Sequence, residues 1–215
     1  MNHTRKLFTA LALAIVFAAP QAQARTALQK HVDFFDRDLD GDIEWYETYE
    51  GCRALGIGTV TSGSFATAIN AALGLSTGGS LFTVMTATIH QGMHGSDTGI
   101  YDSNGNYVQE AFNALFNNYD HNRDDLLDED EFDALYAGQY TDAGGSAASR
   151  AEFEVLIDVA GETRTQSKTW SACSYWWCPS YSYTESYDVL TRKTMESFYD
   201  GSLFYVIAGE PVPND

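Results

Sequence analysis

Basic residues are scarce in this chain, which carries 12 Lys and Arg against 30 Asp and Glu and has a formal net charge of −18 at pH 7. Phosphate groups would repel a surface this acidic, so we exclude nucleic acid as a partner. Long hydrophobic runs are also missing, since no unbroken apolar run reaches the roughly 18 residues that a transmembrane helix needs. The length of 215 residues still allows one large domain or two small ones with a hydrophobic core.

The N-terminus has the pattern of a secretory signal peptide. Arg5 and Lys6 precede an apolar run over residues 7–19, and Ala22-Gln23-Ala24 fits a small-residue cleavage site. We therefore predict that residues 1–24 are removed and that the mature protein is exported, to the periplasm or as a secreted protein. An uncleaved N-terminal anchor is the alternative.

Cysteine is scarce as well, with three in the chain. In an exported protein this number indicates one disulfide and one leftover thiol. Cys173 and Cys178 lie between two segments, near 164–172 and 179–187, whose alternating pattern predicts the strands of a β-hairpin. We predict a disulfide between these two cysteines at the mouth of the hairpin and a free thiol at Cys52.

Acidic residues gather in two twelve-residue segments. The first loop, residues 36–47, reads DRDLDGDIEWYE and matches an EF-hand calcium loop at every key position. Gly41 stands at position 6, where the chain turns sharply and needs backbone freedom. The predicted Ca²⁺ ligands are Asp36, Asp38, Asp40, Asp42 through its backbone carbonyl, Glu44 through a water molecule, and Glu47 with both oxygens.

The second loop, residues 120–131, reads DHNRDDLLDEDE and has Asp125 where glycine normally makes the turn. Asp tolerates a left-handed backbone less easily than Gly, so we expect this loop to bind calcium more weakly or with strain. EF-hand loops usually pack in pairs, and we predict that these two meet through Ile43 and Leu127 at position 8. The predicted ligands are Asp120, Asn122, Asp124, Leu126 through its carbonyl, Asp128 and Glu131.

Residues 54–89 contain neither a charged residue nor a proline, and they predict a buried helical pair broken near Gly78 and Gly79. Peripheral lipid contact is the alternative for this segment. We predict one domain over residues 25–215 that is mainly α, with paired EF-hands, the inserted uncharged helical segment and a small C-terminal β-hairpin. The predicted helices cover residues 26–35, 44–55, 108–119, 150–160 and 189–198, with EF-hand 1 at about 27–56, EF-hand 2 at about 108–137, a loop at 137–149 and a C-terminal region at 150–215.

Three histidines are candidates for chemistry. His31 lies on the predicted helix that enters the first loop, with apolar neighbours on its face, a setting more typical of a core residue than of a ligand. His90 and His94 lie four residues apart and would share one face if residues 83–94 were helical. Two histidines alone indicate a metal site only weakly.

Three segments together resemble the caleosins, the calcium-binding peroxygenases of plants and fungi. Residues 28–56 are similar to the first conserved block of that family, residues 89–107 (IHQGMHGSDTGIYDSNGNY) to its second, and residues 199–205 (YDGSLFY) to its C-terminal signature. The resemblance implies haem b as a cofactor beside calcium. It also implies that His31 and His94, which match the two essential histidines of the family, act at the haem, and His90 has a family counterpart too.

The chain departs from this family in several features. Plant members carry a proline-bearing hydrophobic hairpin that inserts into lipid droplets, and residues 54–89 lack proline. The signal peptide and the cysteine-closed hairpin are further differences, and the second loop is better preserved here. We therefore expect an exported, bacterial-type relative.

The resemblance implies a calcium-binding haem peroxygenase that transfers oxygen from fatty-acid hydroperoxides to unsaturated lipids or sulfides. The alternative is a non-enzymatic EF-hand protein of the cell envelope with a structural or sensor role. The sequence leaves open the substrate, the oligomeric state, and which of His31 and His94 is the proximal ligand of the iron.

Overall fold

The computed structural model of the protein describes residues 25–92, 99–139, 143–171, 173 and 178–213, so the predicted signal peptide lies outside it. No helix in these ranges is long and apolar enough to cross a lipid bilayer. The helices are α1 (Ala27–Asp33), α2 (Trp45–Ala54), α3 (Thr59–Leu73), the 3₁₀ helix η1 (Thr86–Gly92), α4 (Gln109–Tyr119), α5 (Glu129–Gln139), α6 (Ala143–Ala160), α7 (Arg192–Tyr199) and α8 (Leu203–Ala208). The strands are β1 (Asp42–Glu44), β2 (Thr83–Met85), β3 (Leu126–Leu127), β4 (Glu162–Ser171) and β5 (Ser180–Thr191).

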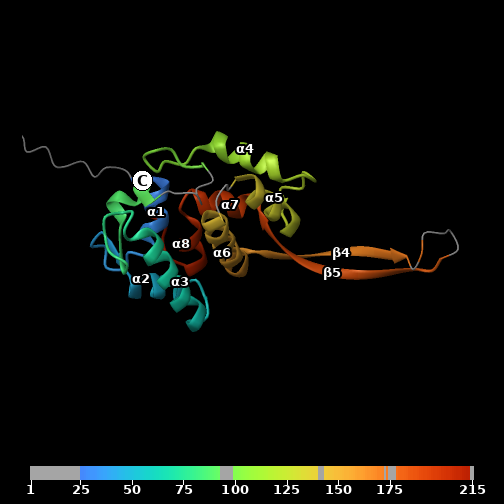
Figure 1. Cartoon of the computed structure of the whole chain (residues 1–215), viewed down its shortest axis with the longest axis horizontal. Helices are drawn as coiled ribbons and strands as arrows, with labels where there is room; N and C mark the ends of the chain where they lie inside the picture. Colours follow the sequence, from blue (N-terminus) through green and yellow to red (C-terminus); the bar gives the residue numbers. More distant parts are fainter. Residues whose placement is uncertain (1–24, 93–98, 140–142, 172, 174–177, 214–215) are drawn as a thin grey trace, which may run out of the picture.

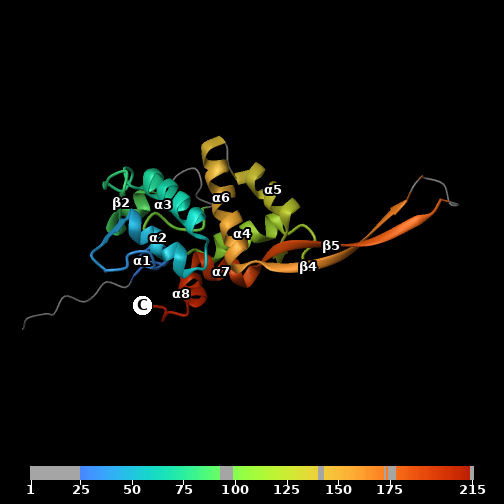
Figure 2. The ribbon, with the colours of Figure 1, turned by 90° about the horizontal axis from the view of Figure 1, so that it is seen from below.

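These elements form a body from which one long arm projects (Figure 1). α1, α2 and α3 make up the end of the body away from the arm, while α4, α6, α7 and α8 occupy its middle (Figure 2). The arm consists of β4 and β5 and leaves the opposite end (Figure 1). Buried apolar side chains form one large cluster that draws on α4, α5, α6 and α7, and two smaller ones around α1 and α2.

The fold is mixed α/β, so the prediction of a mainly α protein is wrong. The described strands form a two-stranded sheet, in the order β1-β2, and a three-stranded sheet, in the order β3-β5-β4, with antiparallel pairs throughout. Helical periodicity in the sequence marks the helices, whereas strands of two or three residues are too short to leave a periodic signal.

The predicted hairpin is confirmed but is not small, because its strands span 10 and 12 residues. Ala172 of the first predicted strand lies outside the described residues. Cys173 and Cys178 form the predicted disulfide beyond the outer ends of both strands. Cys52 is free and buried, also as predicted.

The two acidic loops do not pair with each other, so the predicted contact between Ile43 and Leu127 is wrong. Ile43 lies opposite Val84 in the β1–β2 pair, and Leu127 lies opposite Leu190 in the β3–β5 pair. All four side chains are buried. Each position-8 residue needs a strand partner for its backbone and an apolar neighbour for its side chain. β2 and β5 supply both, so each loop belongs to its own sheet.

The helices on either side of the first loop agree with the prediction to within two residues. Thr26 caps α1 in a capping box: its hydroxyl accepts from the Gln29 backbone N–H, and the Gln29 side chain accepts from the Thr26 backbone N–H. Glu44 and Glu47 stand in the matching positions at the start of α2. These local contacts fix where both helices begin.

Residues 54–89 hold one complete α-helix, α3, rather than the predicted helical pair. α3 ends at Leu73, and the chain turns through Gly74, Gly78 and Gly79 into β2. A Cβ atom at Gly74 would collide with the carbonyl oxygen of Ser80, and one at Gly79 with that of Thr83. The second half of the segment is therefore a glycine-dependent turn that places a strand beside the first loop, followed by η1.

The C-terminal helices α6 and α7 differ from the prediction mainly at their starts, and the last helix, α8, was not predicted. α6 begins at Ala143, inside the predicted loop at 137–149, because an Ala- and Ser-rich stretch is compatible with a helix despite its two glycines. α7 begins at Arg192, three residues after the predicted start, because β5 continues to Thr191. Residues 103–106 form a turn that is closed by the bridge between Tyr101 and Tyr107.

Asn70 fixes α3 against the first loop. Its side chain is fully buried and donates to the carbonyl oxygens of Ile43 and Phe82 at 3.0 Å each. Its own oxygen accepts from the Thr48 hydroxyl at 2.7 Å. Asn70 therefore ties α3 and α2 to β1 and to the residue just before β2.

Replacing Asn70 should destabilise the protein. Asn70→Ala leaves the carbonyl groups of Ile43 and Phe82 without this donor, at a cost of about 1–3 kcal/mol in the free energy of unfolding. Urea denaturation monitored by circular dichroism measures the change. Asn104→Ala, at an exposed turn, is the control and should stay within about 0.5 kcal/mol of the parent. Equal effects of the two substitutions would show that Asn70 does not tie these elements together.

Candidate functional site

The body contains an apolar cavity of about 210 Å³ between its two ends. Side chains of α1, α2, α3, α6, α7 and α8 line it, together with β1, β2 and η1. Protein cores normally contain few voids larger than a water molecule. The cavity is smaller than most small-molecule pockets, but a void of this kind with mostly apolar walls in a packed core is a candidate ligand site.

His31 reaches this cavity from α1. Its Nδ1 lies 3.2 Å from the backbone carbonyl oxygen of Phe198 in α7. Because a carbonyl can only accept, Nδ1 carries the proton, and Nε2 is left with a free lone pair. No other residue of the described ranges hydrogen-bonds the ring. The orientation and tautomer are those of a nitrogen ligand for a metal.

Two aromatic rings hold the imidazole from the C-terminal side. Phe198 meets it edge-on and Phe204 meets it tilted, both with ring centroids 4.7 Å away. Burial lowers the pKa of His31 to about 4, and the hydrogen bond to the Phe198 carbonyl offsets only part of this effect. The ring is therefore neutral near pH 7, as a metal ligand must be.

Glu152 reaches the same cavity from α6 and was not singled out by the sequence analysis. Burial alone raises the pKa of its carboxyl to about 7. A signal for it does exist in the sequence. Val155, Leu156 and Val159, at three, four and seven residues beyond Glu152, line the cavity with it. A carboxylate in register with an apolar helical face is unusual and would have identified this residue.

The other two candidate histidines are His90 and His94. His90 lies in η1, and residues 83–85 before it form the strand β2 and are not part of a helix with His90. His90 is not among the residues that line the cavity. His94 lies outside the described residues.

The first loop brings its predicted ligands together. Carboxylate oxygens of Asp36, Asp38 and Asp40 lie within 4.8 Å of one another. Glu47 is fully buried, and its two oxygens accept from the backbone N–H groups of Arg37 and Glu44, at 2.9 Å each. The loop therefore brings the carboxylates of positions 1, 3 and 5 together and fixes that of position 12 by backbone hydrogen bonds.

The second loop repeats this geometry contact by contact. The position-6 N–H donates to the position-1 carboxylate in both, from Gly41 to Asp36 at 3.0 Å and from Asp125 to Asp120 at 3.1 Å. Glu131 accepts from the backbone of His121 at 2.8 Å and of Asp128 at 3.1 Å, as Glu47 does in the first loop. The two loops thus have the same internal scaffold.

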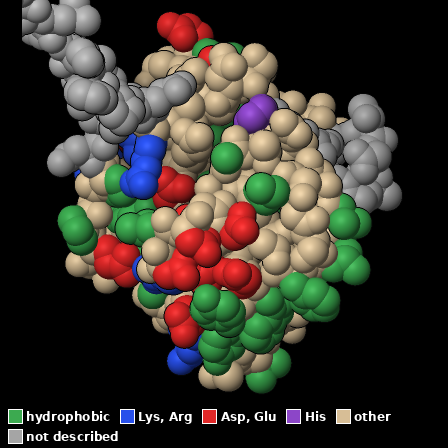
Figure 3. All heavy atoms as spheres, turned by 90° about the vertical axis from the view of Figure 1, so that its left-hand side faces the viewer, with side chains coloured by type: hydrophobic (Ala, Val, Ile, Leu, Met, Phe, Trp, Pro, Cys, Tyr) green, Lys and Arg blue, Asp and Glu red, His purple; other side chains and the backbone are tan. Residues whose placement is uncertain are grey.

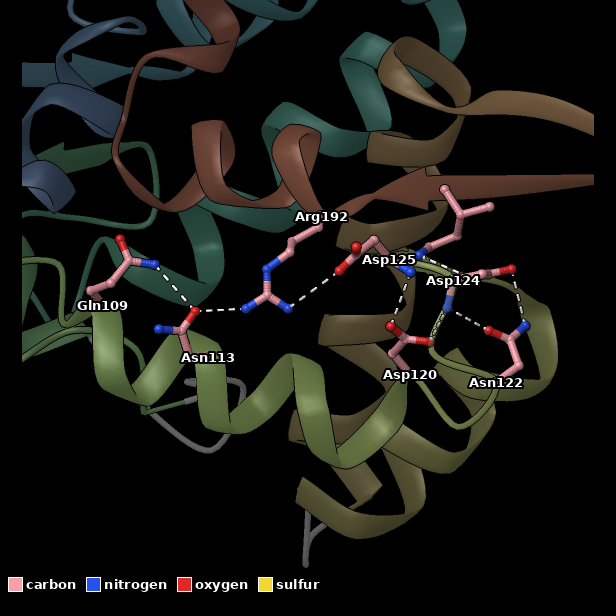
Figure 4. Close-up of polar contacts among 8 residues, drawn as sticks. Gln109, Asn113, Asp120, Asn122, Asp124, Asp125 and Arg192 are labelled. Atoms are coloured by element: carbon pink, nitrogen blue, oxygen red, sulfur yellow. Dashed lines mark hydrogen bonds and ion pairs between the residues drawn. The ribbon is translucent and has the colours of Figure 1, made fainter.

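Asp125 adopts the left-handed backbone that its place in the loop requires, with φ of 59°. Arg192, the first residue of α7, contacts Asp125 in two ways. Its backbone N–H donates to the Asp125 carbonyl at 2.9 Å, and its guanidinium lies 3.8 Å from the Asp125 carboxylate. Figure 4 shows Arg192 between Asp125 and Asn113 of α4, whose oxygen accepts at 2.6 Å. The second loop is therefore connected to α7, the helix whose Phe198 carbonyl binds His31.

Acidic side chains gather on the surface at the end of the body formed by α1, α2 and α3 (Figure 3). Figure 3, which views the end formed by α1, α2 and α3, shows a cluster of Asp and Glu side chains beside hydrophobic ones. Burial raises the pKa of Asp36 and of Glu131 within the two loops. A bound cation would favour the charged forms of both.

Comparison with known proteins identifies the family of this chain. Residues 23–168 match the family described as "Caleosin related protein". The chain belongs to the caleosin family. It is 32% identical over 184 residues to "Probable peroxygenase 4" of Arabidopsis thaliana, covering 82% of this chain and 83% of the relative. It is 29% identical over 186 residues to "Peroxygenase" of Lilium longiflorum, covering 83% and 68%. No solved structure matched it.

The caleosin blocks that lie far apart in the sequence meet at His31. The C-terminal block, residues 199–205, turns at Gly201 with φ of 82°. A Cβ atom there would lie 2.5 Å from the Ala27 carbonyl oxygen and 2.9 Å from the His31 backbone nitrogen. Glycine therefore lets this block pack directly on α1, and Phe204 of the same block contacts the His31 ring.

The residues at the cavity fit the haem that a caleosin implies. A neutral imidazole with a free Nε2 lone pair, fixed through Nδ1 by a backbone carbonyl, is the donor that axial haem ligation uses. The walls are predominantly apolar, as the macrocycle requires. Among the described residues, His31 is the one histidine that lines this cavity.

Gly201→Ala should test the contact between the C-terminal block and α1. Gly209→Ala is the matched control, because its φ of 70° imposes similar backbone strain but no atom lies within 4 Å of the added Cβ. We expect Gly201→Ala to lower the free energy of unfolding by about 1–3 kcal/mol more than the control, from steric overlap with α1. Chemical denaturation of both variants measures this. Equal losses would mean that the block does not depend on close packing at His31.

Proposed function

We propose that this caleosin is a calcium-binding haem peroxygenase that takes oxygen from fatty-acid hydroperoxides and passes it to unsaturated lipids or sulfides. The observation that carries the proposal is His31, a neutral imidazole that faces an apolar cavity with Nε2 free. The peroxygenase names of its relatives from Arabidopsis thaliana and Lilium longiflorum point to the same chemistry. The signal-peptide pattern and the disulfide support an exported enzyme.

The residues of the chain would act as follows. His31 would hold the haem iron through Nε2, and the Phe198 carbonyl would keep the imidazole in the required tautomer. Bound haem supplies the redox chemistry by which a hydroperoxide loses one oxygen atom to an acceptor. The apolar walls bind the alkyl chain of a lipid and exclude water. We assign His94 the second histidine role that the family implies.

We propose that lipid reaches the protein at the turn between α3 and β2. Leu75, Leu81 and Phe82 are 65%, 51% and 63% exposed there. Three large apolar side chains on one exposed turn favour peripheral contact with a lipid surface. α3, which ends at this turn, also lines the cavity. Lipid bound at the turn would therefore lie near the wall of the proposed site.

Haem reconstitution of the calcium-loaded mature chain tests the proposal. We expect a Soret band and transfer of oxygen from a fatty-acid hydroperoxide to an organic sulfide. His31→Ala should lose at least 90% of both, because it removes the iron ligand. His121→Ala, which alters an exposed histidine of the second loop, is the matched control and should keep both.

Folding of the His31→Ala variant is checked by circular dichroism, so that loss of haem is separated from loss of structure. Absence of a Soret band in the folded wild-type chain would contradict the proposal and favour the non-enzymatic envelope protein. A wild-type Soret band in folded His31→Ala would show that another group holds the iron.

We also propose that both loops bind calcium, through the ligands predicted from the sequence, and that calcium supports the haem site. The first loop begins at Asp36, directly after the segment that carries His31. The second loop continues through β3 into β5 and α7, which provides the Phe198 carbonyl. Without cations, repulsion among the loop carboxylates should loosen both connections.

Glu47→Gln and Glu131→Gln separate the two loops. Isothermal titration calorimetry should show the larger loss of affinity for Glu47→Gln, because the first loop has glycine at position 6 and the second holds Asp125 in a left-handed backbone. Chelation by EDTA should lower haem occupancy, and added calcium should restore it. Haem occupancy that is unchanged after verified metal removal would contradict the coupling.

A further inference from the structure

Glu152 is a carboxyl group placed where an apolar side chain would be expected. It lines the cavity from α6, while His31 lines it from α1. Its neighbour Phe153 contacts Phe198, with ring centroids 6.5 Å apart, and Phe198 in turn contacts His31. An imidazole and a carboxyl group therefore face one apolar cavity from separate helices.

No described residue pairs with the Glu152 side chain through a hydrogen bond or an ion pair. The titratable groups that line the same cavity are His31 of α1, Cys52 of α2, Tyr199 of α7 and Tyr101, and no Lys, Arg or further carboxylate of the described ranges is among them. Burial without a cationic partner holds the pKa of Glu152 at about 7. An apolar residue at this place would be more stable, so its presence points to chemistry.

We propose that Glu152 is the acid–base group of the oxygen transfer, a role that rests on the proposed peroxygenase function. Its carboxylate takes the O–H proton of the hydroperoxide and returns it to the alkoxide oxygen as the O–O bond breaks. The hydroperoxide ROOH leaves as the alcohol ROH, reduced by two electrons. The acceptor gains the other oxygen atom and is oxidised by two electrons, so no further reductant is needed.

The position and chemistry of Glu152 fit both proton transfers. A group that must first accept and then donate a proton works best when its pKa lies near the working pH. His31 cannot take this part, because Nδ1 donates to Phe198 and Nε2 is committed to the iron in the proposed site. Glu152 is the remaining cavity-lining group among the described residues that changes charge near neutrality.

Glu152→Gln removes the proton acceptor and keeps the shape of the side chain. We expect haem content and Soret band to match wild type, while the rate of hydroperoxide cleavage falls about 100-fold or more. The wild-type rate should change with pH around 7, and this dependence should disappear in the variant. Glu154→Gln, an exposed glutamate on the same helix, is the control and should behave as wild type.

A second measurement uses the haem-free chain and so does not depend on activity. Infrared spectroscopy should show a protonated carboxyl band that titrates near pH 7 and is missing in Glu152→Gln. Because the folded pKa is raised, the native state binds more protons than the unfolded state between about pH 4.5 and 7. Stability should therefore fall as pH rises through this window in wild type, and less so in Glu152→Gln.

The outcomes are distinguishable. A folded wild-type chain that binds no haem overturns the proposed function and this role with it. Haem-loaded Glu152→Gln with the wild-type rate and pH profile overturns the role of Glu152 alone. A carboxyl band that titrates near pH 4.5 in the haem-free chain overturns it as well, because a carboxylate with that pKa would be too weak a base to take the hydroperoxide proton at neutral pH.

Discussion

The hydrogen bond from His31 Nδ1 to the Phe198 carbonyl is the contact on which the proposed site depends. It joins residues 167 positions apart in the sequence, at the first and seventh α-helices. It sets the tautomer of the ring and directs Nε2 away from the backbone. Phe198 and Phe204 pack on the same ring, and Gly201 lets their segment approach α1 closely enough for both contacts. The C-terminal caleosin block is therefore part of the histidine site.

Each acidic loop is connected to one of the two helices that this hydrogen bond joins. The first loop follows α1, which carries His31, and the second is bound through Asp125 and Leu127 to Arg192 and Leu190, where β5 passes into α7. A change in either loop would therefore reach one partner of the hydrogen bond. Each loop has its own strand partner, so the two can act on the site without contacting each other through their strands.

Local features of the fold were predictable from the sequence. The capping residue Thr26, the loop ligands with Gly41, and the cysteines around the hairpin each depend on neighbours within a few residues. Partners distant in sequence were not predictable in this way. Ile43 satisfies the pattern of a position-8 residue whether it pairs with Leu127 or with Val84, and only the packing of the whole chain selects Val84. The composition of residues 54–89 likewise could not predict β2, because a short strand after a glycine-dependent turn leaves no periodic pattern in the sequence.

The residues of the candidate site were likewise predictable only in part. The family resemblance identifies His31 as a site residue, because its apolar surroundings alone favour a core residue. Glu152 can be identified only from the cavity in the structure.

The most direct test of the account is a crystal structure of the calcium-loaded chain with haem. We predict iron bonded to Nε2 of His31, with Nδ1 still donating to the Phe198 carbonyl. Haem bound elsewhere, or held without His31, would contradict the account.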